Sequence, residues 1–377
     1  MGHFKSIRPF NDSEIKDILG SLCNSQEVIN LFVQASKPNL WSYIPFFNWI
    51  IRNRINRLAS SINSVDQLQN YFKKLVSNTI TNSMEEFTSS GVENLDTKKN
   101  YLFVSNHRDI TLDPALLNFV INKNGHQTSN IAVGNNLMSK EWAANLMRLN
   151  KSFIIQRDGE SKKEIYNSLI LASEFINHCL NNHQSVWIAQ KQGRAKDGID
   201  KTDPAILKMI HLMERKNTSP GEFFNGINLI PVSISYEKDP NDIQKAIELA
   251  ELADHKNYQK GELEDLQSIA RGIKEQKGRV HLSIGKKLEL NKEDDYKEIA
   301  SKLTATILKN YKIFPTNIAA YELVSNKKYD HSFTDMEIDS AKNYLQSRIE
   351  GHSESIKRYF LYQYANAVIR LNEDISL

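Results

Sequence analysis

Short apolar runs that end in polar residues, and that alternate with longer amphipathic stretches, restrict the fold of this chain more than any other feature. The runs have the length and the boundaries of buried strands. They lie at residues 101–104, 130–134, 151–157, 185–189, 227–236 and 279–284. Strands that alternate with helices are typical of an α/β layer. We therefore predict an α/β fold with a mixed central sheet flanked by helices.

Helical periodicity dominates both ends of the chain, from residue 11 to about 90 and again from residue 292 onward. At about 150 residues per domain, 377 residues exceed one average unit. We predict a helical N-terminal region at residues 1–90, with contact to a membrane surface, and an α/β domain at residues 91–320. A helical C-terminal extension follows at residues 321–377.

Charge and cysteine content narrow the class of protein. The chain has 48 Lys and Arg against 45 Asp and Glu, a formal net charge of +3, which gives no reason to expect a nucleic-acid partner. Its two cysteines, Cys23 and Cys179, have no metal-ligand spacing around them and indicate a reducing compartment. Because no apolar stretch reaches the ~18–20 residues of a spanning helix, we expect a cytoplasmic or peripheral protein.

One segment of the N-terminal region is rich in aromatic residues and is followed directly by arginines. Its members are Trp41, Tyr43, Phe46, Phe47, Trp49, Arg52, Arg54 and Arg57. Aromatic and cationic side chains together suit the headgroup region of a bilayer. Aromatic residues at helical spacing also pack in cores. The sequence leaves both interpretations open.

The first polar cluster, at residues 105–114, follows the run at 101–104 and contains a candidate catalytic histidine. His107 at a strand end can act as a general base near neutral pH. A carboxylate that orients the ring could come from Asp113 or Asp109. The alternative is a solvated loop histidine. His107-Arg108-Asp109 also spells a kinase triplet, but the other kinase motifs are absent from the chain.

Two further strand ends carry the residues of an anion site. Arg157 closes the run at 151–157, and a loop at residues 190–198 contains Lys191, Arg194 and Lys196 beside Gly193 and Gly198. Arginine suits bidentate phosphate binding, and glycine lets backbone N–H groups approach a ligand. A solvated basic turn is the alternative. The chain has no Walker spacing, dinucleotide fingerprint or Gly-x-Ser-x-Gly motif.

The order of these clusters resembles the glycerolipid acyltransferases, the superfamily of glycerol-3-phosphate and 1-acylglycerol-3-phosphate acyltransferases. Four blocks at about residues 90–240 carry the resemblance: Asn106-His107 with Asp113-Pro114, Phe153 to Arg157, Gln192 to Gly198, and Ile230-Pro231-Val232-Ser233-Ile234. The long helical ends resemble a bacterial subgroup of this superfamily. Two departures stand out. Five residues separate His107 from Asp113 where the family has four, and Gln192 replaces a glutamate.

The resemblance implies an O-acyltransferase of phospholipid biosynthesis, peripheral at the cytoplasmic face of a membrane. It implies that His107, oriented by Asp113, activates a hydroxyl of glycerol 3-phosphate or lysophosphatidate. The donor would be acyl-CoA or an acylated carrier protein, with no cofactor and no metal. The substrate-binding residues it implies are Arg157, Gln192, Gly193, Arg194, Lys196 and Pro231. Two alternatives stay open: a catalytically weak, membrane-associated lipid-binding protein, and an acyltransferase for another lyso-lipid acceptor.

Overall fold

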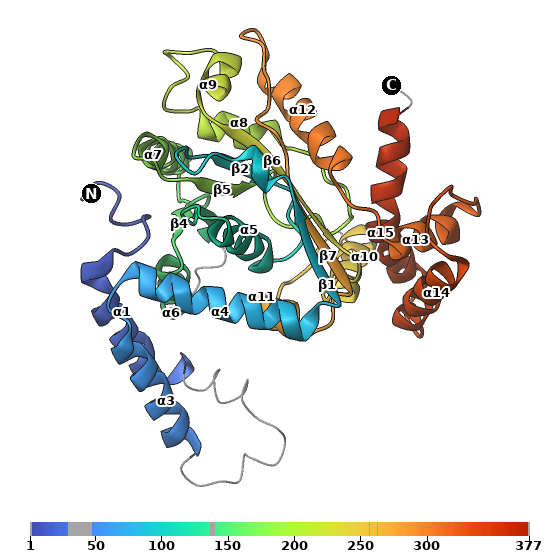
Figure 1. The fold of residues 1–377 in the computed structure, drawn as a ribbon, viewed down its shortest axis with the longest axis horizontal. Helices are drawn as coiled ribbons and strands as arrows, with labels where there is room; N and C mark the ends of the chain where they lie inside the picture. The colour runs from blue at the N-terminus through green and yellow to red at the C-terminus, as the bar shows by residue number, and fades with distance from the viewer. Residues whose placement is uncertain (1, 29–46, 136–139, 256, 262, 376–377) are drawn as a thin grey trace. The chain divides into compact units, whose positions relative to one another are not determined.

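The computed structural model describes residues 2–28, 47–135, 140–255, 257–261 and 263–375, and Figure 1 shows their fold. The chain forms two compact units. The first consists of Met1–Leu75 and Asn130–Phe175, and the second of Val76–Ser129 and Ile176–Leu377. The first unit therefore combines part of the predicted helical N-terminal region with an internal segment of the predicted α/β domain.

The strands confirm all six apolar runs as strands and add one more. They are β1 (Glu86–Ser90), β2 (Leu102–Ser105), β3 (Asn130–Gly134), β4 (Ser152–Ile155), β5 (Val186–Ala189), β6 (Leu229–Tyr236) and β7 (Arg279–Ile284). The prediction that residues 1–90 are helical was wrong at β1. This strand stands at the end of the strand order and is only partly buried, so it lacks the apolar run of an internal strand.

Helices occupy most of the remaining chain. They are α1 (Asp12–Asn24), α3 (Phe47–Ser61), α4 (Val65–Ser83), α5 (Leu112–Lys123), α6 (Glu141–Leu149), α7 (Lys162–Asn181), α8 (Pro204–Ile210), α9 (Pro220–Gly226), α10 (Asp242–His255), α11 (Glu264–Lys274), α12 (Tyr296–Lys309), α13 (Pro315–Ser325), α14 (Asp335–Ile349) and α15 (Glu354–Ile375), with one 3-10 turn, η2 (Val92–Asn94). The helices confirm the predicted α/β class with helical additions at both ends.

In the second unit the strands are ordered β1-β7-β6-β2-β5. Strand β2 pairs in parallel with both β5 and β6, and β1 pairs in parallel with β7. Strand β7 runs antiparallel to β6, with Tyr236 opposite Val280, so the sheet is mixed. The carboxyl ends of β2, β5 and β6 therefore share one edge with the start of β7. Open α/β sheets carry their reactive groups at such an edge.

The first unit contains the parallel pair β3 and β4, in which Ala132 lies opposite Phe153. Its helix α1 begins with a capping box between Asn11 and Glu14, which satisfies backbone N–H groups at the helix start. The predicted aromatic segment falls largely outside the described residues, because residues 29–46 are not described. Phe47 opens α3. Among the described residues no helix is long and apolar enough to cross a membrane.

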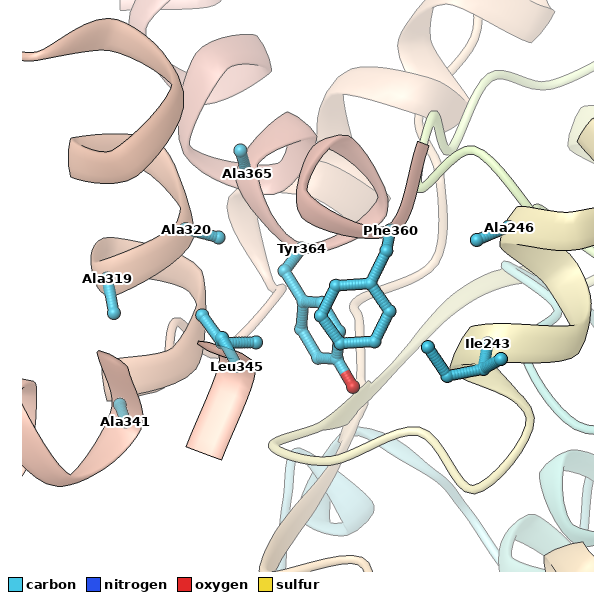
Figure 2. Close-up of a cluster of buried hydrophobic side chains, with 9 residues drawn as sticks. All are labelled: Ile243, Ala246, Ala319, Ala320, Ala341, Leu345, Phe360, Tyr364 and Ala365. Carbon is cyan, nitrogen blue, oxygen red and sulfur yellow. The ribbon is translucent and has the colours of Figure 1, made fainter. Parts of the chain in front are cut away.

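The C-terminal helices pack onto the α/β part of the second unit and share one core with α10. Buried side chains from four helices form this core: Ile243, Ala246, Ala319, Ala320, Ala341, Leu345, Phe360, Tyr364 and Ala365. Figure 2 shows the rings of Phe360 and Tyr364 side by side, and their centroids are 5.5 Å apart. Small alanine side chains let α13 and α15 approach closely. The predicted C-terminal extension is thus integrated into the second unit.

Candidate active site

The Asp113 carboxylate, at the start of α5, organises the loop that follows β2. Its Oδ2 atom lies 2.8 Å from His107 Nδ1 and accepts hydrogen bonds from the backbone N–H groups of Arg108 (2.6 Å) and Asp109 (3.0 Å). Its Oδ1 atom accepts a hydrogen bond of 2.8 Å from the Tyr236 hydroxyl. The Asp113 side chain is 1% exposed, and these four donors replace the water it has lost.

This geometry fixes the tautomer of His107. An ionised carboxylate only accepts hydrogen bonds, so Nδ1 carries the ring proton and Nε2 keeps its lone pair. Asp109, the other candidate partner of His107, binds backbone N–H groups instead. Its Oδ1 accepts the backbone N–H groups of Thr111 (3.0 Å) and Leu112 (2.9 Å) at the start of α5. Burial, reinforced by the nearby Asp113 charge, raises the pKa of the Asp109 carboxyl.

Asn106 holds the loop in place against the strand next to β2. Its side-chain Nδ2 donates to the Ile234 carbonyl (3.0 Å), and its Oδ1 accepts the Ile234 N–H (2.8 Å). The same Nδ2 donates to Asp200 Oδ2 (3.0 Å). Trp187 of β5 contacts the His107 ring edge-on, with centroids 5.6 Å apart. The site is thus assembled on the carboxyl ends of three adjacent strands.

The glycine-containing loop after β5 lies directly beside this histidine loop. The Ala195 N–H donates to the His107 carbonyl at 2.8 Å. The Arg108 guanidinium donates to Asp200 Oδ2 at 2.6 Å, and both groups are buried. Two of the polar clusters that the sequence places at strand ends, residues 105–114 and 190–198, therefore lie in contact. Gly193 has a φ of 72° and is exposed, a conformation that favours glycine.

The predicted substrate-binding residues of this loop differ in their surroundings. Arg194 donates to Ser268 Oγ at 2.7 Å. Lys196 forms an ion pair with Glu248, and Gln192 is exposed. Lys191 donates to the Ile199 carbonyl at 3.0 Å. Of these three cations, Arg194 is the one that donates a hydrogen bond to a neutral side chain. The binding roles of Gln192, Gly193, Arg194 and Lys196 stay predictions.

Two other predicted residues belong to other elements. Arg157 belongs to the first unit, where its N–H donates to Asn135 Oδ1 at 3.3 Å; burial lowers the pKa of its guanidinium. Pro231 is buried within β6 opposite Val104, and its carbonyl accepts the Gly285 N–H at 2.8 Å. It therefore lies inside the sheet, whereas the same strand reaches Asp113 through Tyr236. The substrate-binding roles of Arg157 and Pro231 stay predictions.

Sequence reasoning did not select Tyr236, Asn106 or Asp200 as site residues. Tyr236 ends the longest apolar run. Its polar hydroxyl at a strand end is the feature of the sequence that could have identified it. Asn106 precedes His107 and belongs to the motif quoted above. The sequence therefore indicated its position next to His107 but not the hydrogen bonds that it forms. Asp200 carried no local signal, because its partners Asn106 and Arg108 are about 90 residues away in the chain.

A buried lysine supports the histidine loop from α10. Lys245 Nζ donates to the Arg108 carbonyl at 2.7 Å and forms an ion pair with Asp239. Burial lowers the pKa of Lys245, and the Asp239 charge opposes that shift. Burial also raises the pKa of the Tyr236 hydroxyl well above its ordinary value, so this group keeps its proton at physiological pH and donates a hydrogen bond to Asp113. Across the described residues no three His, Cys, Asp or Glu side chains are placed to hold a metal ion.

Part of the chain matches a known family model. Residues 86–235, from β1 almost to the end of β6, match the family model described as Acyltransferase. This match supports an acyltransferase family for that segment. One similar solved structure is the crystal structure of the 1-acyl-sn-glycerophosphate (LPA) acyltransferase PlsC from Thermotoga maritima. It has 15% identity and a TM-score of 0.39, over 64% of this chain and 78% of that chain. No curated protein matches the chain.

Proposed function

We propose that this protein transfers a fatty acyl group from a thioester donor to a hydroxyl of glycerol 3-phosphate or lysophosphatidate. The observation that carries the proposal is the hydrogen bond between His107 Nδ1 and Asp113, inside the segment that matches the acyltransferase family model. A histidine oriented in this way by a buried carboxylate is suited to general-base catalysis. It stands beside a loop whose arginine is suited to a phosphate.

In the proposed reaction, His107 Nε2 removes the proton of the acceptor hydroxyl. The oxygen attacks the thioester carbonyl, a C–O bond forms, and the C–S bond breaks as the thiol leaves with the proton. Asp113 stabilises the imidazolium that forms in between. The reaction as proposed uses no cofactor, no metal and no covalent acyl-enzyme. Arg194 holds the acceptor phosphate, so that orientation supplies much of the rate.

Acyl transfer from labelled acyl-CoA or acylated carrier protein to glycerol 3-phosphate, lysophosphatidate and other lyso-lipids tests the proposal. We expect His107→Ala to lower kcat by roughly 10²–10⁴. His352→Ala, a histidine in the turn after α14, is the matched control and should leave kcat unchanged. A folded His107→Ala protein with full activity would contradict the mechanism.

The carboxylate partner can be tested in the same assay. Asp113 accepts hydrogen bonds through both oxygens, and Asp113→Asn keeps only one acceptor oxygen and loses the charge that stabilises the imidazolium, so kcat should fall by a comparable factor. Asp109→Asn is the matched control, because an asparagine oxygen can still accept the N–H groups at the start of α5. Equal losses in the two variants would mean that Asp113 has no special relation to His107.

Gln192 keeps the second function open, a membrane-associated lipid-binding protein of low activity. It stands where the resembled family has glutamate, and it is exposed. If the wild-type protein binds lysophosphatidate vesicles but transfers no acyl group from either donor, this alternative is correct. Activity on a different lyso-lipid alone would instead reassign the acceptor and keep the chemistry.

We also propose that the protein acts at the cytoplasmic surface of a membrane. The support is the sequence of the aromatic segment with its following arginines, together with lipid acceptors that reside in a bilayer. Co-sedimentation with anionic liposomes should weaken when Phe46 and Trp49 are both changed to Ser. Unchanged binding by a folded double variant would assign these side chains to the protein core.

A further inference from the structure

A small polar pocket lies beside the glycine-containing loop, between Arg194 and the helices α10 and α11. Its charged lining residues are Arg194, Lys245, Glu248, Glu264 and Arg271. Three of these have strong partners. Glu248 pairs with Lys196, Lys245 is in the buried ion pair described above, and Glu264 accepts a hydrogen bond of 2.7 Å from the Tyr258 hydroxyl. The other two charged lining residues are Arg194 and Arg271.

Neither guanidinium in this pocket is paired with a carboxylate. Arg194 Nη1 donates to Ser268 Oγ at 2.7 Å, and Arg271 Nε donates to Asn241 Oδ1 at 2.9 Å, so both partners are neutral. Within the described part of the chain, no carboxylate oxygen lies within 4.0 Å of either guanidinium. Both side chains are partly buried. Partly buried cations of this kind are stabilised by an anionic ligand, and guanidiniums suit phosphate.

Helix α11 packs directly against the loop that follows β2 and carries His107. A Cβ added at Gly272 would lie 2.2 Å from Asp109 Oδ2, so the helix backbone touches the loop that carries His107. The antiparallel direction of β7 explains this position. Strand β7 begins at the sheet edge where β6 ends, and α11 immediately precedes it in the chain. Helix α11 lies beyond the residues that match the family model.

We propose that Arg271 determines specificity for a phosphorylated acceptor, and that it binds the acceptor's phosphate monoester together with Arg194. Ser268, held by Arg194, adds a hydroxyl at the same place. The proposal rests on the proposed acyl transfer and adds to it a second guanidinium from a helix outside the matched segment. Coenzyme A also carries phosphate groups. The KM for the acceptor and the KM for the donor are therefore measured separately, to tell which phosphate Arg271 binds.

Steady-state kinetics of Arg271→Gln and Arg271→Lys test this assignment, with Lys274→Gln as the matched control. Lys274 is exposed on the same helix and does not line the pocket, so its variant removes one charge without touching the site. We expect Arg271→Gln to raise the KM for glycerol 3-phosphate by roughly 10–100-fold, because hydrogen bonds to charged groups are involved. Arg271→Lys should recover part of this loss. Lys274→Gln should leave the KM for glycerol 3-phosphate unchanged. The KM for the donor should not change in any of the three variants.

Direct binding separates failure of this inference from failure of the proposed function. Glycerol 3-phosphate is titrated calorimetrically into the wild-type protein and each variant. An active wild type whose acceptor KM and affinity survive Arg271→Gln overturns the role of Arg271 and leaves the acyl transfer intact. A rise in the KM for acyl-CoA alone also overturns it. An inactive wild type that binds glycerol 3-phosphate through Arg271 supports the pocket and refutes the acyl transfer, and absence of both refutes both.

Discussion

Lys277 shows how a single buried side chain links stability to pH. It is fully buried, and its ammonium group donates to Ser83 Oγ and to the Glu275 carbonyl, both at 2.7 Å. Burial lowers the pKa of Lys277 to about 8, while nearby acids, Asp109 foremost, oppose that shift. In the unfolded chain a lysine titrates near pH 10.4.

From this difference we predict that Lys277 makes the protein more stable as the pH rises from about 8 to 10. Over that range the unfolded lysine still holds a proton that the folded one has released, so the free energy of unfolding increases with pH. Urea unfolding at several pH values, on the wild type and on Lys277→Met, measures the effect. The variant should lose this rise, and parallel curves for the two proteins would contradict the prediction.

At the scale of elements, α15 holds the glycine-containing loop at the active site. Asn366 Nδ2 donates to the Asp197 carbonyl at 2.7 Å. Gly198, with a φ of 77°, packs so tightly that an added Cβ would lie 2.2 Å from the Gln363 carbonyl oxygen. The same loop bonds the His107 carbonyl through Ala195. A C-terminal helix is therefore connected to His107, the proposed general base, through one short loop.

We predict that Gly198→Ala destabilises the protein by about 2–4 kcal/mol, the sum of backbone strain and a steric clash. Gly351→Ala is the matched control. Its φ is also 77°, but no atom lies within 4 Å of the added Cβ, so it should cost only about 1 kcal/mol. Chemical unfolding of both variants gives the two values. If the two losses are equal, the contact of Gly198 with α15 contributes nothing.

At the scale of the whole molecule, the shared core of the second unit joins the C-terminal helices to the α/β part. Phe360 is fully buried in this core beside Tyr364, whose hydroxyl donates to Asp242 Oδ2 at 2.9 Å. The Asp239 N–H in turn donates to that hydroxyl at 3.0 Å. Apolar packing, shown in Figure 2, and a buried polar network thus connect α15 to α10 and to the segment just before it.

Because of this connection we predict that Phe360→Ala costs about 3–5 kcal/mol of unfolding free energy, as expected for an aromatic ring removed from a packed core. Met336→Ala on α14 is the control, since Met336 is 80% exposed and should change stability by less than about 0.5 kcal/mol. Acyl-transfer activity in urea should disappear together with the circular dichroism signal in Phe360→Ala. Activity that outlasts the loss of helix signal would show that the C-terminal helices unfold separately.

Much of the sheet could be predicted from the sequence because its internal strands are buried. Strands β2 and β6 are buried along their whole length, and such strands appear in the sequence as apolar runs. Strand β1 could not be found in this way, since its polar side chains lie at the end of the strand order. The pairing of β1 with β7 spans about 190 residues of sequence and leaves no local pattern.

The sequence by itself located the candidate histidine, His107, and the basic loop, because each lies in one short segment at a strand end. It left Asp109 and Asp113 as alternatives, and the start of α5 decided between them by directing Asp113 toward His107. Tertiary structure alone brought Tyr236 and Arg271 to the site. Both come from elements more than 100 residues beyond His107, and only the parallel pairing of β2 with β6 and the antiparallel return of β7 place them at the same edge of the sheet.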